Sequence, residues 1–271
     1  MTESFEFDLG PYDPDTEELA DHDHDIEPLE TWAGEQLADK SGAVFFDIET
    51  GPMREDELAM IYHEKTLEEF STTCDKRWKP DTIAAKYEDY KITAWDTFVE
   101  KAALSAVTGR VLLIGIVEGD KWLSIFHKTE AENLAIFWAR VECWLSDKCL
   151  IIDHNSNAFD LPFLVRRSWM LGVHVPRDIR QGRYWHPLFR DTMEWWACGA
   201  REFTRLNDIA AAFGVGQKTE GVHGRDFHKL WFGTMPTEAW GTPEEQRQTA
   251  LEYCEQDVRL TAAIAAKMGM V

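Results

Sequence analysis

The sequence has few cysteines and no long apolar segment. Its five cysteines are an odd number and form no CxxC pair, which excludes a disulfide framework and a zinc knuckle. No apolar run approaches the ~18 residues of a membrane-spanning helix, and the acidic N-terminus lacks the apolar region of a signal peptide. We therefore expect a reduced, cytoplasmic protein that does not insert into membranes.

Basic residues are also scarce, because 28 Lys and Arg stand against 49 Asp and Glu in 271 residues, a net charge of −21. Residues 1–40 hold 14 acids and one Lys, which is −13. Such blocks stay solvated unless a partner neutralises them. We therefore predict that residues 1–40 form a disordered acidic tail, which could bind a protein partner. Residues 41–271 are expected to form one domain. The string DHDHDIE mixes His with carboxylates, but a solvated tail explains it better than a metal site.

The remainder alternates apolar strands with helices. Runs such as AVFFDIE and CLIIDHN are typical of buried strands, and Gly119-Asp120 between two further runs indicates a hairpin. Helices are expected at 55–70, 83–107 (capped by Asp81-Thr82), 130–146, 161–172, 191–199, 206–215 and 243–268. This order predicts an α/β fold, a mixed β-sheet flanked by helices.

Two carboxylates interrupt the first strand. Asp47 and Glu49 are two residues apart, so the alternation of a strand puts both on one face near its C-terminal end. Acids in an apolar run repel each other and lose hydration, which is unfavourable unless a cation lies between them. Taken alone, one of the pair could equally point to solvent at the end of the strand.

Two later segments carry the same chemistry. Asp160 opens a helix after the strand CLIIDHN, where a carboxylate is either a helix N-cap or lies in the crevice beyond the strand ends, which binds ligands in α/β folds. Tyr253 and Asp257 share one face of the last helix, either as core and surface residues or as part of a site. Together, four carboxylates without His or Cys partners suit Mg²⁺ or Mn²⁺.

The segments FFDIETG, HNSNAFDLPFL and YCEQD resemble, in order and spacing, the three motifs of the DEDD superfamily of ribonuclease H-like 3′–5′ exonucleases. Tyr253, four residues before the last Asp, is typical of the tyrosine subclass, since the histidine subclass has His where this chain has Glu252. The second motif is similar to that of the proofreading domain of family B DNA polymerases. The resemblance covers about 44–267 and extends to stand-alone bacterial and phage exonucleases of this type.

This resemblance implies a ribonuclease H-like fold and two divalent ions, Mg²⁺ or Mn²⁺. Such a pair of ions clamps the attacking and leaving oxygens of a phosphodiester. By matching, Asp47 bridges both ions, Glu49 and Asp257 bind the ion beside the nucleophile, and Asp160 holds the other through water. Tyr253 orients the attacking water, and a phenol suits this role because its pKa near 10 keeps it protonated.

The resemblance also implies contacts to the substrate. Asn155 and Phe159 would meet the 3′-terminal nucleotide, and Lys218 is favoured as a basic contact. Thr50 and Gly51 would approach the terminal base through their backbone, where Gly permits close contact.

A basic and aromatic segment follows the second motif. Residues 164–205 contain eight Arg against four acids, with Trp, Tyr and Phe interleaved. This composition suits a single-stranded nucleic acid, and we expect Arg180 and Arg183 to contact it. Alternatively, the aromatics are core, and Arg166 and Arg167 are only the solvated face of a helix. Asp191 within this segment is expected to be a helix N-cap rather than a metal ligand.

The sequence is interpreted as a metal-dependent 3′–5′ exonuclease that converts single-stranded DNA, or the 3′ ends of DNA, to nucleoside monophosphates. RNA stays open as a substrate, because contacts to the 2′-hydroxyl are not visible in a sequence. Two other classes remain: a nucleic-acid-binding adaptor that retains the nuclease fold, and an interaction protein that works through its acidic tail. The intact set of four carboxylates and a tyrosine argues against the adaptor.

Overall fold

The computed structural model describes residues 42–127, 129–218, 221–222 and 224–271. The acidic tail predicted at 1–40 lies outside these residues. The strands are β1 (Ala43–Pro52), β2 (Gly109–Glu118), β3 (Lys121–Ile125), β4 (Leu150–Asp153), β5 (Arg180–Gln181), β6 (Tyr184–Trp185) and β7 (Phe189–Asp191). The α-helices are α1 (Glu55–Ile61), α2 (Leu67–Thr72), α3 (Pro80–Ala102), α4 (Glu130–Ser146), α5 (Asp160–Met170), α6 (Thr192–Ala197), α7 (Leu206–Phe213), α8 (Phe227–Trp231), α9 (Thr237–Trp240) and α10 (Pro243–Lys267).

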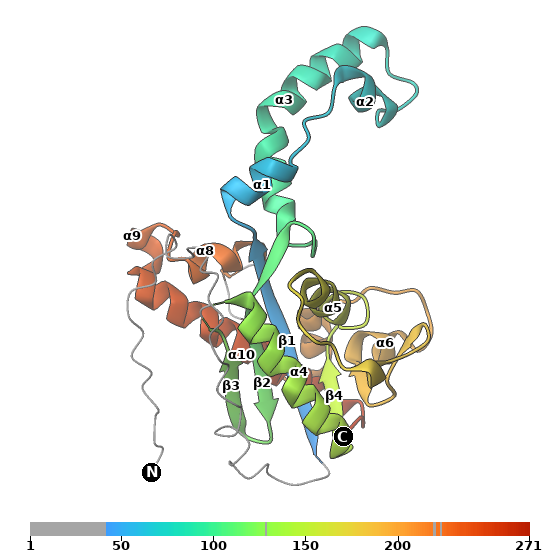
Figure 1. Ribbon diagram of the computed structural model, residues 1–271, viewed down its shortest axis with the longest axis vertical. Coiled ribbons are helices and arrows are strands. Elements are labelled where there is room, and N and C mark those ends of the chain that lie inside the picture. Colours follow the sequence, from blue (N-terminus) through green and yellow to red (C-terminus); the bar gives the residue numbers. More distant parts are fainter. Residues whose placement is uncertain (1–41, 128, 219–220, 223) are drawn as a thin grey trace. The chain divides into compact units, whose positions relative to one another are not determined.

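A mixed sheet forms the centre of the domain (Figure 1), with strand order β3-β2-β1-β4-β7. β1 pairs antiparallel with β2 and parallel with β4, and β4 pairs parallel with β7. The predicted fold class, a mixed sheet flanked by helices, is confirmed. Because β1 and β4 run in the same direction, their carboxyl ends meet at one edge of the sheet.

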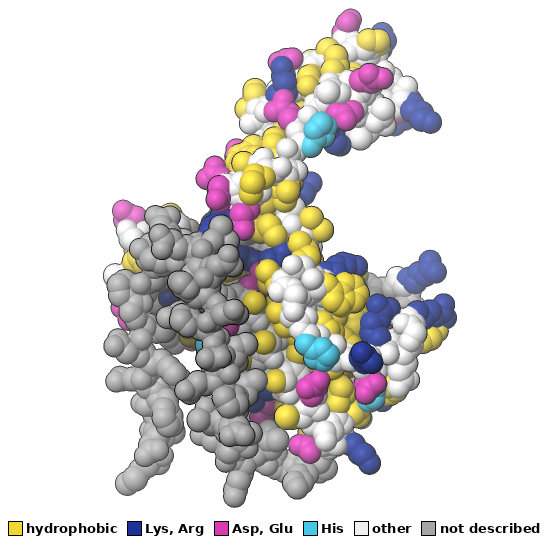
Figure 2. Space-filling view, viewed as in Figure 1, with side chains coloured by type: hydrophobic (Ala, Val, Ile, Leu, Met, Phe, Trp, Pro, Cys, Tyr) yellow, Lys and Arg dark blue, Asp and Glu magenta, His cyan; other side chains and the backbone are white. Residues whose placement is uncertain are grey.

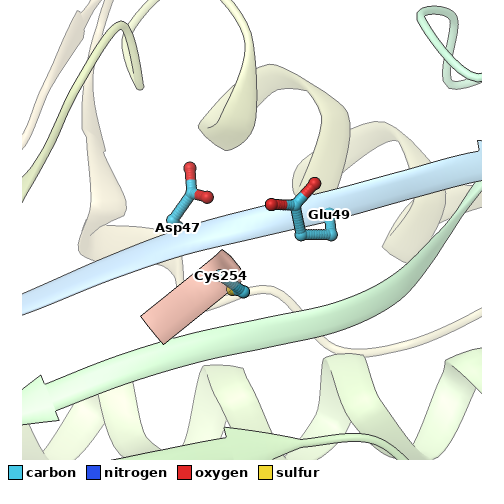
Figure 3. A group of neighbouring side chains, drawn as sticks. All are labelled: Asp47, Glu49 and Cys254. Atoms are coloured by element: carbon cyan, nitrogen blue, oxygen red, sulfur yellow. The ribbon is translucent and has the colours of Figure 1, made fainter. Parts of the chain in front are cut away.

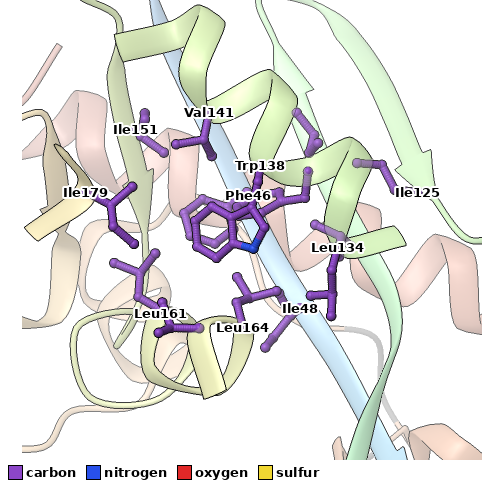
Figure 4. Close-up of a cluster of buried hydrophobic side chains, with 14 of the residues drawn as sticks. Phe46, Ile48, Ile125, Leu134, Trp138, Val141, Ile151, Leu161, Leu164 and Ile179 are labelled. Carbon is purple, nitrogen blue, oxygen red and sulfur yellow. The ribbon is translucent and has the colours of Figure 1, made fainter. Parts of the chain in front are cut away.

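Side chains alternate between the two faces of β1. Phe46 and Ile48 join the larger core, which α4 and α5 cover with Trp138 and other large apolar residues (Figure 4). Phe45 faces the other way and packs with Val258 of α10. The central strand is therefore held from both sides, which fixes the direction of any side chain at its end.

The Gly119-Asp120 turn joins β2 and β3 in a hairpin, as predicted. Several boundaries differ from expectation. The helix expected at 55–70 is two helices, α1 and α2, and α3 begins at Pro80, whose fixed φ suits the first turn of a helix. The short strand β7 was not expected, because three residues are too few to show a period. None of the helices in the described ranges has both the length and the apolar character that crossing a membrane requires.

Three helices, α1 to α3, connect β1 to β2 (Figure 1). Aromatic rings hold them together. The ring of Tyr62 packs edge-on against that of Trp95 and lies tilted against that of Phe98, with 5.1 Å between ring centroids in both pairs. Phe70 of α2 lies 5.1 Å from Tyr90 of α3. These pairs give the connection a small apolar core of its own.

Arg167 is buried, contrary to the alternative that it lies on a solvated helix face. Its guanidinium donates to both oxygens of Glu130, at 2.9 and 2.6 Å, and to the carbonyl oxygen of Ala106 at 3.1 Å. Arg166, the preceding residue, is exposed. Arg167 therefore ties α5 to the start of α4 and is not available to nucleic acid.

Replacing Arg167 by Ala should lower the free energy of unfolding by ~3–5 kcal/mol, because the Glu130 carboxylate would stay buried without its partner. Urea unfolding followed by circular dichroism measures this. The matched control is Arg166→Ala on the same helix, which should change stability by less than about 0.5 kcal/mol. Equal losses in the two variants would contradict the role of the ion pair.

Candidate active site

The end of β1 presents two carboxylates. Oxygens of Asp47 and Glu49 and the sulfur of Cys254, from α10, all lie within 4.8 Å of one another (Figure 3). The register of β1 on β2 shifts between Glu49 and Thr50, and such a bulge locally bends a strand. Both acids thus lie within β1, just before this irregularity and next to the last helix.

The loop between β4 and α5 brings Asp160 to the same edge. Asp160 is the first residue of α5 and is 3% exposed. The loop contains Asn155 with φ 68°, a left-handed conformation that Asn tolerates better than most residues. Asp191 holds this loop, since its carboxylate accepts hydrogen bonds from the backbone N–H of Asn155 at 2.9 Å and Asn157 at 3.1 Å. Asp191 also caps α6, as predicted.

Helix α10 supplies the third segment. Tyr253 and Asp257, one turn apart, are both buried. Lys218, from the loop after α7, donates a hydrogen bond to Oδ2 of Asp257, and its Nζ lies 3.4 Å from the Tyr253 hydroxyl. The other oxygen of Asp257 is buried and has no hydrogen-bond partner within the described part of the chain.

One cavity of about 720 Å³ joins these three segments. The residues that line it include eight of those singled out in the sequence: Asp47, Glu49, Asn155, Phe159, Asp160, Lys218, Tyr253 and Asp257. Four carboxylates and a phenol from three separate segments of the chain therefore line one cavity.

The carboxylates perturb one another. Burial raises the pKa of Asp47 well above its usual range, and Asp160 and Asp257 raise it further, whereas Lys218 lowers it. Burial also raises the pKa of Glu49, with Asp47 as the next cause. Burial raises the pKa of Asp160 to about 7, despite hydrogen bonds from backbone N–H groups that lower it. Without a cation, this cluster binds protons instead.

The phenol and the lysine respond in a different way. Burial, followed by the charge of Asp257, raises the pKa of Tyr253, so its hydroxyl stays protonated at neutral pH. Burial lowers the pKa of Lys218, but the charge and hydrogen bond of Asp257 outweigh this, so the net direction is upward. Lys218 is therefore a permanent positive charge beside Asp257.

A fifth carboxylate, Asp153, was missed in the sequence. It is the last residue of β4 and 1% exposed, and its oxygens lie within 4.8 Å of those of Asp47 and Asp160. Burial raises its pKa well above the usual range, and Asp160 and Asp47 add to this. The available signal in the sequence was an acid at the end of the apolar run CLIID.

The cavity is also lined by residues that were not assigned to it from the sequence, among them His154, Phe203 and Arg205. Phe203 is 69% exposed, which is unusual for such a large apolar side chain. The imidazole of His154 hydrogen-bonds to the Thr192 hydroxyl at 2.9 Å. Exposed phenylalanine in a polar cavity is a surface on which a ring of a ligand can stack.

Thr50 and Gly51 are not among the residues that line the cavity. The hydroxyl of Thr50 donates to the carbonyl oxygen of Ala103 at 2.7 Å. A Cβ on Gly51 would lie 2.6 Å from a methyl of Leu112 and 3.1 Å from Cβ of His228. Close packing of the protein on itself thus already requires glycine here, and the contact of this backbone with a terminal base stays a prediction.

Arg180 and Arg183 lie on the β5–β6 hairpin, outside the residues that line this cavity. Arg180 stacks on Trp185 at 5.2 Å, and Arg183 on Tyr184 at 4.7 Å, from guanidinium carbon to ring centroid. Figure 2 shows Lys and Arg side chains on this side of the domain. The hairpin is a separate basic and aromatic surface.

Comparison with known proteins places the fold. Residues 99–269, more than half of the chain, match a family model described as the RNase_H superfamily. The chain belongs to the RNase H superfamily. The matched region includes Asp160, Tyr253 and Asp257, whereas Asp47 and Glu49 precede it.

A solved structure with a similar fold is that of the family B DNA polymerase from the hyperthermophilic archaeon Pyrobaculum calidifontis, with a TM-score of 0.51 at 18% sequence identity. The match covers 83% of this chain but only 24% of the polymerase chain. At this identity the likeness concerns the fold alone. No curated protein matches the sequence.

The raised pKa of Asp160 predicts a pH dependence of stability in the absence of metal. Because the folded pKa, about 7, lies above the ordinary value of ~3.9, this group stabilises the fold fully below pH ~4 and the contribution is lost as the pH rises through 7. In EDTA, the melting temperature of Asp160→Asn minus that of the wild type should therefore increase as the pH is raised from 4.5 to 8. Differential scanning fluorimetry measures this, and a pH-independent difference would contradict it.

Proposed function

We propose that the chain is a metal-dependent 3′–5′ exonuclease of the DEDD superfamily, tyrosine subclass, that releases nucleoside monophosphates from single-stranded DNA. The observation that carries the proposal is the meeting of four carboxylates and a phenol, from three distant segments, around one cavity. Membership of the RNase H superfamily supports a nuclease. The direction of degradation and the preference for DNA rest on the resemblance of the motifs to those of proofreading domains.

The donor set fits divalent cations. All four predicted ligands, Asp47, Glu49, Asp160 and Asp257, offer carboxylate oxygens, which Mg²⁺ and Mn²⁺ prefer. A buried oxygen of Asp257 without a hydrogen-bond partner in the described residues is consistent with this. Two ions held there would supply a Lewis acid at the phosphate and stabilise the attacking and leaving oxygens.

Tyr253 would position the attacking water. Its hydroxyl stays protonated, and Lys218 Nζ, 3.4 Å away, is placed to donate to the phenol oxygen. The phenol proton is shared with the Asp257 carboxylate in this state, and it would turn to the attacking water once Asp257 binds a metal ion. Lys218 also brings a positive charge to the place where a phosphate would develop negative charge.

Three further residues of the cavity would hold the end of the strand. Asn155 and Phe159 lie beside Asp160, and the exposed ring of Phe203 lines the same cavity. We propose that these contact the 3′-terminal nucleotide and that Arg180 and Arg183 contact the strand farther from its end. We further propose that residues 41–271 form the nuclease domain and that the acidic tail binds a protein partner.

The protein should shorten 5′-labelled single-stranded DNA stepwise with Mg²⁺ or Mn²⁺ and should stop in EDTA. Asp47→Asn should slow this by at least about a hundredfold, since a lost metal ligand removes several kcal/mol of transition-state stabilisation and each ~1.4 kcal/mol is tenfold. Gel electrophoresis of the labelled products measures the rate. The control is Asp120→Asn in the exposed β2–β3 turn, which should cleave like the wild type.

Three outcomes would overturn this proposal: undiminished digestion in EDTA, internal cuts only, or release of the 5′ label as the first product. An RNA of the same sequence, labelled in the same way, separates an exoribonuclease from a deoxyribonuclease. Binding of both strands without cleavage of either would instead favour the adaptor.

Tyr253→Phe removes one hydroxyl and keeps the ring, which packs 6.2 Å from Phe227 between centroids. If Tyr253 positions water, kcat should fall by roughly 10²–10⁴ with little change in KM. Tyr87→Phe is the matched control, because its hydroxyl bonds the carbonyl oxygen of Lys65, away from the cavity. Full activity of Tyr253→Phe with a lowered melting temperature would leave the tyrosine a structural role only.

A further inference from the structure

The neighbourhood of Asp153 differs from that of the other buried carboxylate on the same sheet edge. Asp153 and Asp191 are paired across β4 and β7, and both are almost fully buried. Asp191 is satisfied by the protein itself: besides the two loop N–H groups, it accepts from those of Met193 at 2.9 Å and Glu194 at 3.3 Å. Asp191 shows what a purely structural buried carboxylate looks like in this fold.

Asp153 lacks such partners. One of its oxygens accepts from the backbone N–H of His154 at 2.5 Å. The other is buried and has no hydrogen-bond partner within the described residues. Among charged groups, Asp160 and Asp47 raise its pKa most, and its side chain is within hydrogen-bonding reach of Asp160, so the two carboxyls share a proton when no cation is bound. A buried carboxylate oxygen that no donor of the described residues satisfies, on a side chain grouped with two other carboxylates, is one that a cation would stabilise.

The distances suit one ion. Oxygens of Asp47, Asp153 and Asp160 all lie within 4.8 Å of one another. Mg²⁺ binds six oxygens at about 2.0–2.1 Å, so neighbouring ligands lie about 3 Å apart and opposite ones about 4.2 Å apart. Small rotations of the side chains would bring three such oxygens onto one octahedron.

We propose that Asp153 is a direct ligand of a divalent metal ion that it holds together with Asp47 and Asp160. The proposal rests on the proposed function for the identity of the ion and adds a fifth carboxylate to the predicted ligands. It also separates the two ends of the site. Three carboxylates are grouped at the end near Asp153, whereas Asp257 at the other end already pairs with Lys218.

This asymmetry predicts that one ion binds more tightly and without nucleic acid. In the full-length protein, titration with Mn²⁺, followed by the electron paramagnetic resonance signal of free Mn²⁺, should reveal a tight site. Asp153→Asn keeps the size of the side chain and the oxygen that accepts from His154, but removes the charge. It should weaken that site by at least about tenfold and reduce the rise in melting temperature that Mn²⁺ causes.

The matched control is Asp208→Asn, which removes the same charge from an exposed residue of the same cavity and should leave Mn²⁺ affinity unchanged. A second variant, Asp153→Cys, should shift the preference from Mn²⁺ toward Cd²⁺, because thiolates select soft metals. Asp208→Cys shows how much of any Cd²⁺ binding comes from Cys254, which both variants retain. A residue with only a structural role would not change the metal preference.

Wild-type Mn²⁺ affinity in Asp153→Asn, or no greater Cd²⁺ preference in Asp153→Cys than in Asp208→Cys, would overturn the inference and leave the proposed nuclease intact. Conversely, a tight Mn²⁺ site that depends on Asp153, in a protein that degrades neither DNA nor RNA, would support the inference and remove the proposed function. A wild-type protein that binds no Mn²⁺ would overturn both.

Discussion

Repulsion among buried carboxylates at the carboxyl ends of β1 and β4 is the constraint on which this structure depends. Each of these groups loses hydration on folding and has a like charge nearby. The fold must therefore supply enough stability elsewhere to hold them together. Apolar layers on both faces of β1 supply it, with α4 and α5 on one side and α10 on the other.

The protein satisfies some of its buried charges and leaves others open. Asp191 is saturated by backbone N–H groups, and Arg167 is saturated by Glu130 and a carbonyl oxygen. Asp153 and Asp257 each keep one oxygen without a hydrogen-bond partner in the described residues. The fully hydrogen-bonded groups fix the loop and the helices around the cavity. The carboxylates with an oxygen that lacks a hydrogen bond are the places where a cation would be stabilised.

Local periodicity explains what could be predicted from the sequence. A strand alternates every residue, so Asp47 and Glu49 could be placed together, and a helix repeats every 3.6 residues, so Tyr253 and Asp257 could be placed on one face. Strand and helix alternation was also enough for the fold class. Each of these predictions needs only neighbours within one element.

Pairings between distant segments explain what was missed. Arg167 meets Glu130, which is 37 residues away, so its burial has no local signal. Asp153 joins the cluster through the parallel register of β4 on β1, which a single sequence does not reveal. The close packing of Gly51 against Leu112 and His228 also has no local signal, because both neighbours come from far along the chain.

The helical connection α1 to α3 affects how the domain assembles. It separates β1 from its hairpin partner β2, so the strand that carries Asp47 and Glu49 cannot pair by a tight turn. Closing a longer loop costs about 0.6 kcal/mol for each doubling of its length, but helices that first pack through their own aromatic rings bring the two ends closer. We therefore expect local helix formation to precede insertion of the central strand, so that the acidic cluster assembles only once the sheet is complete.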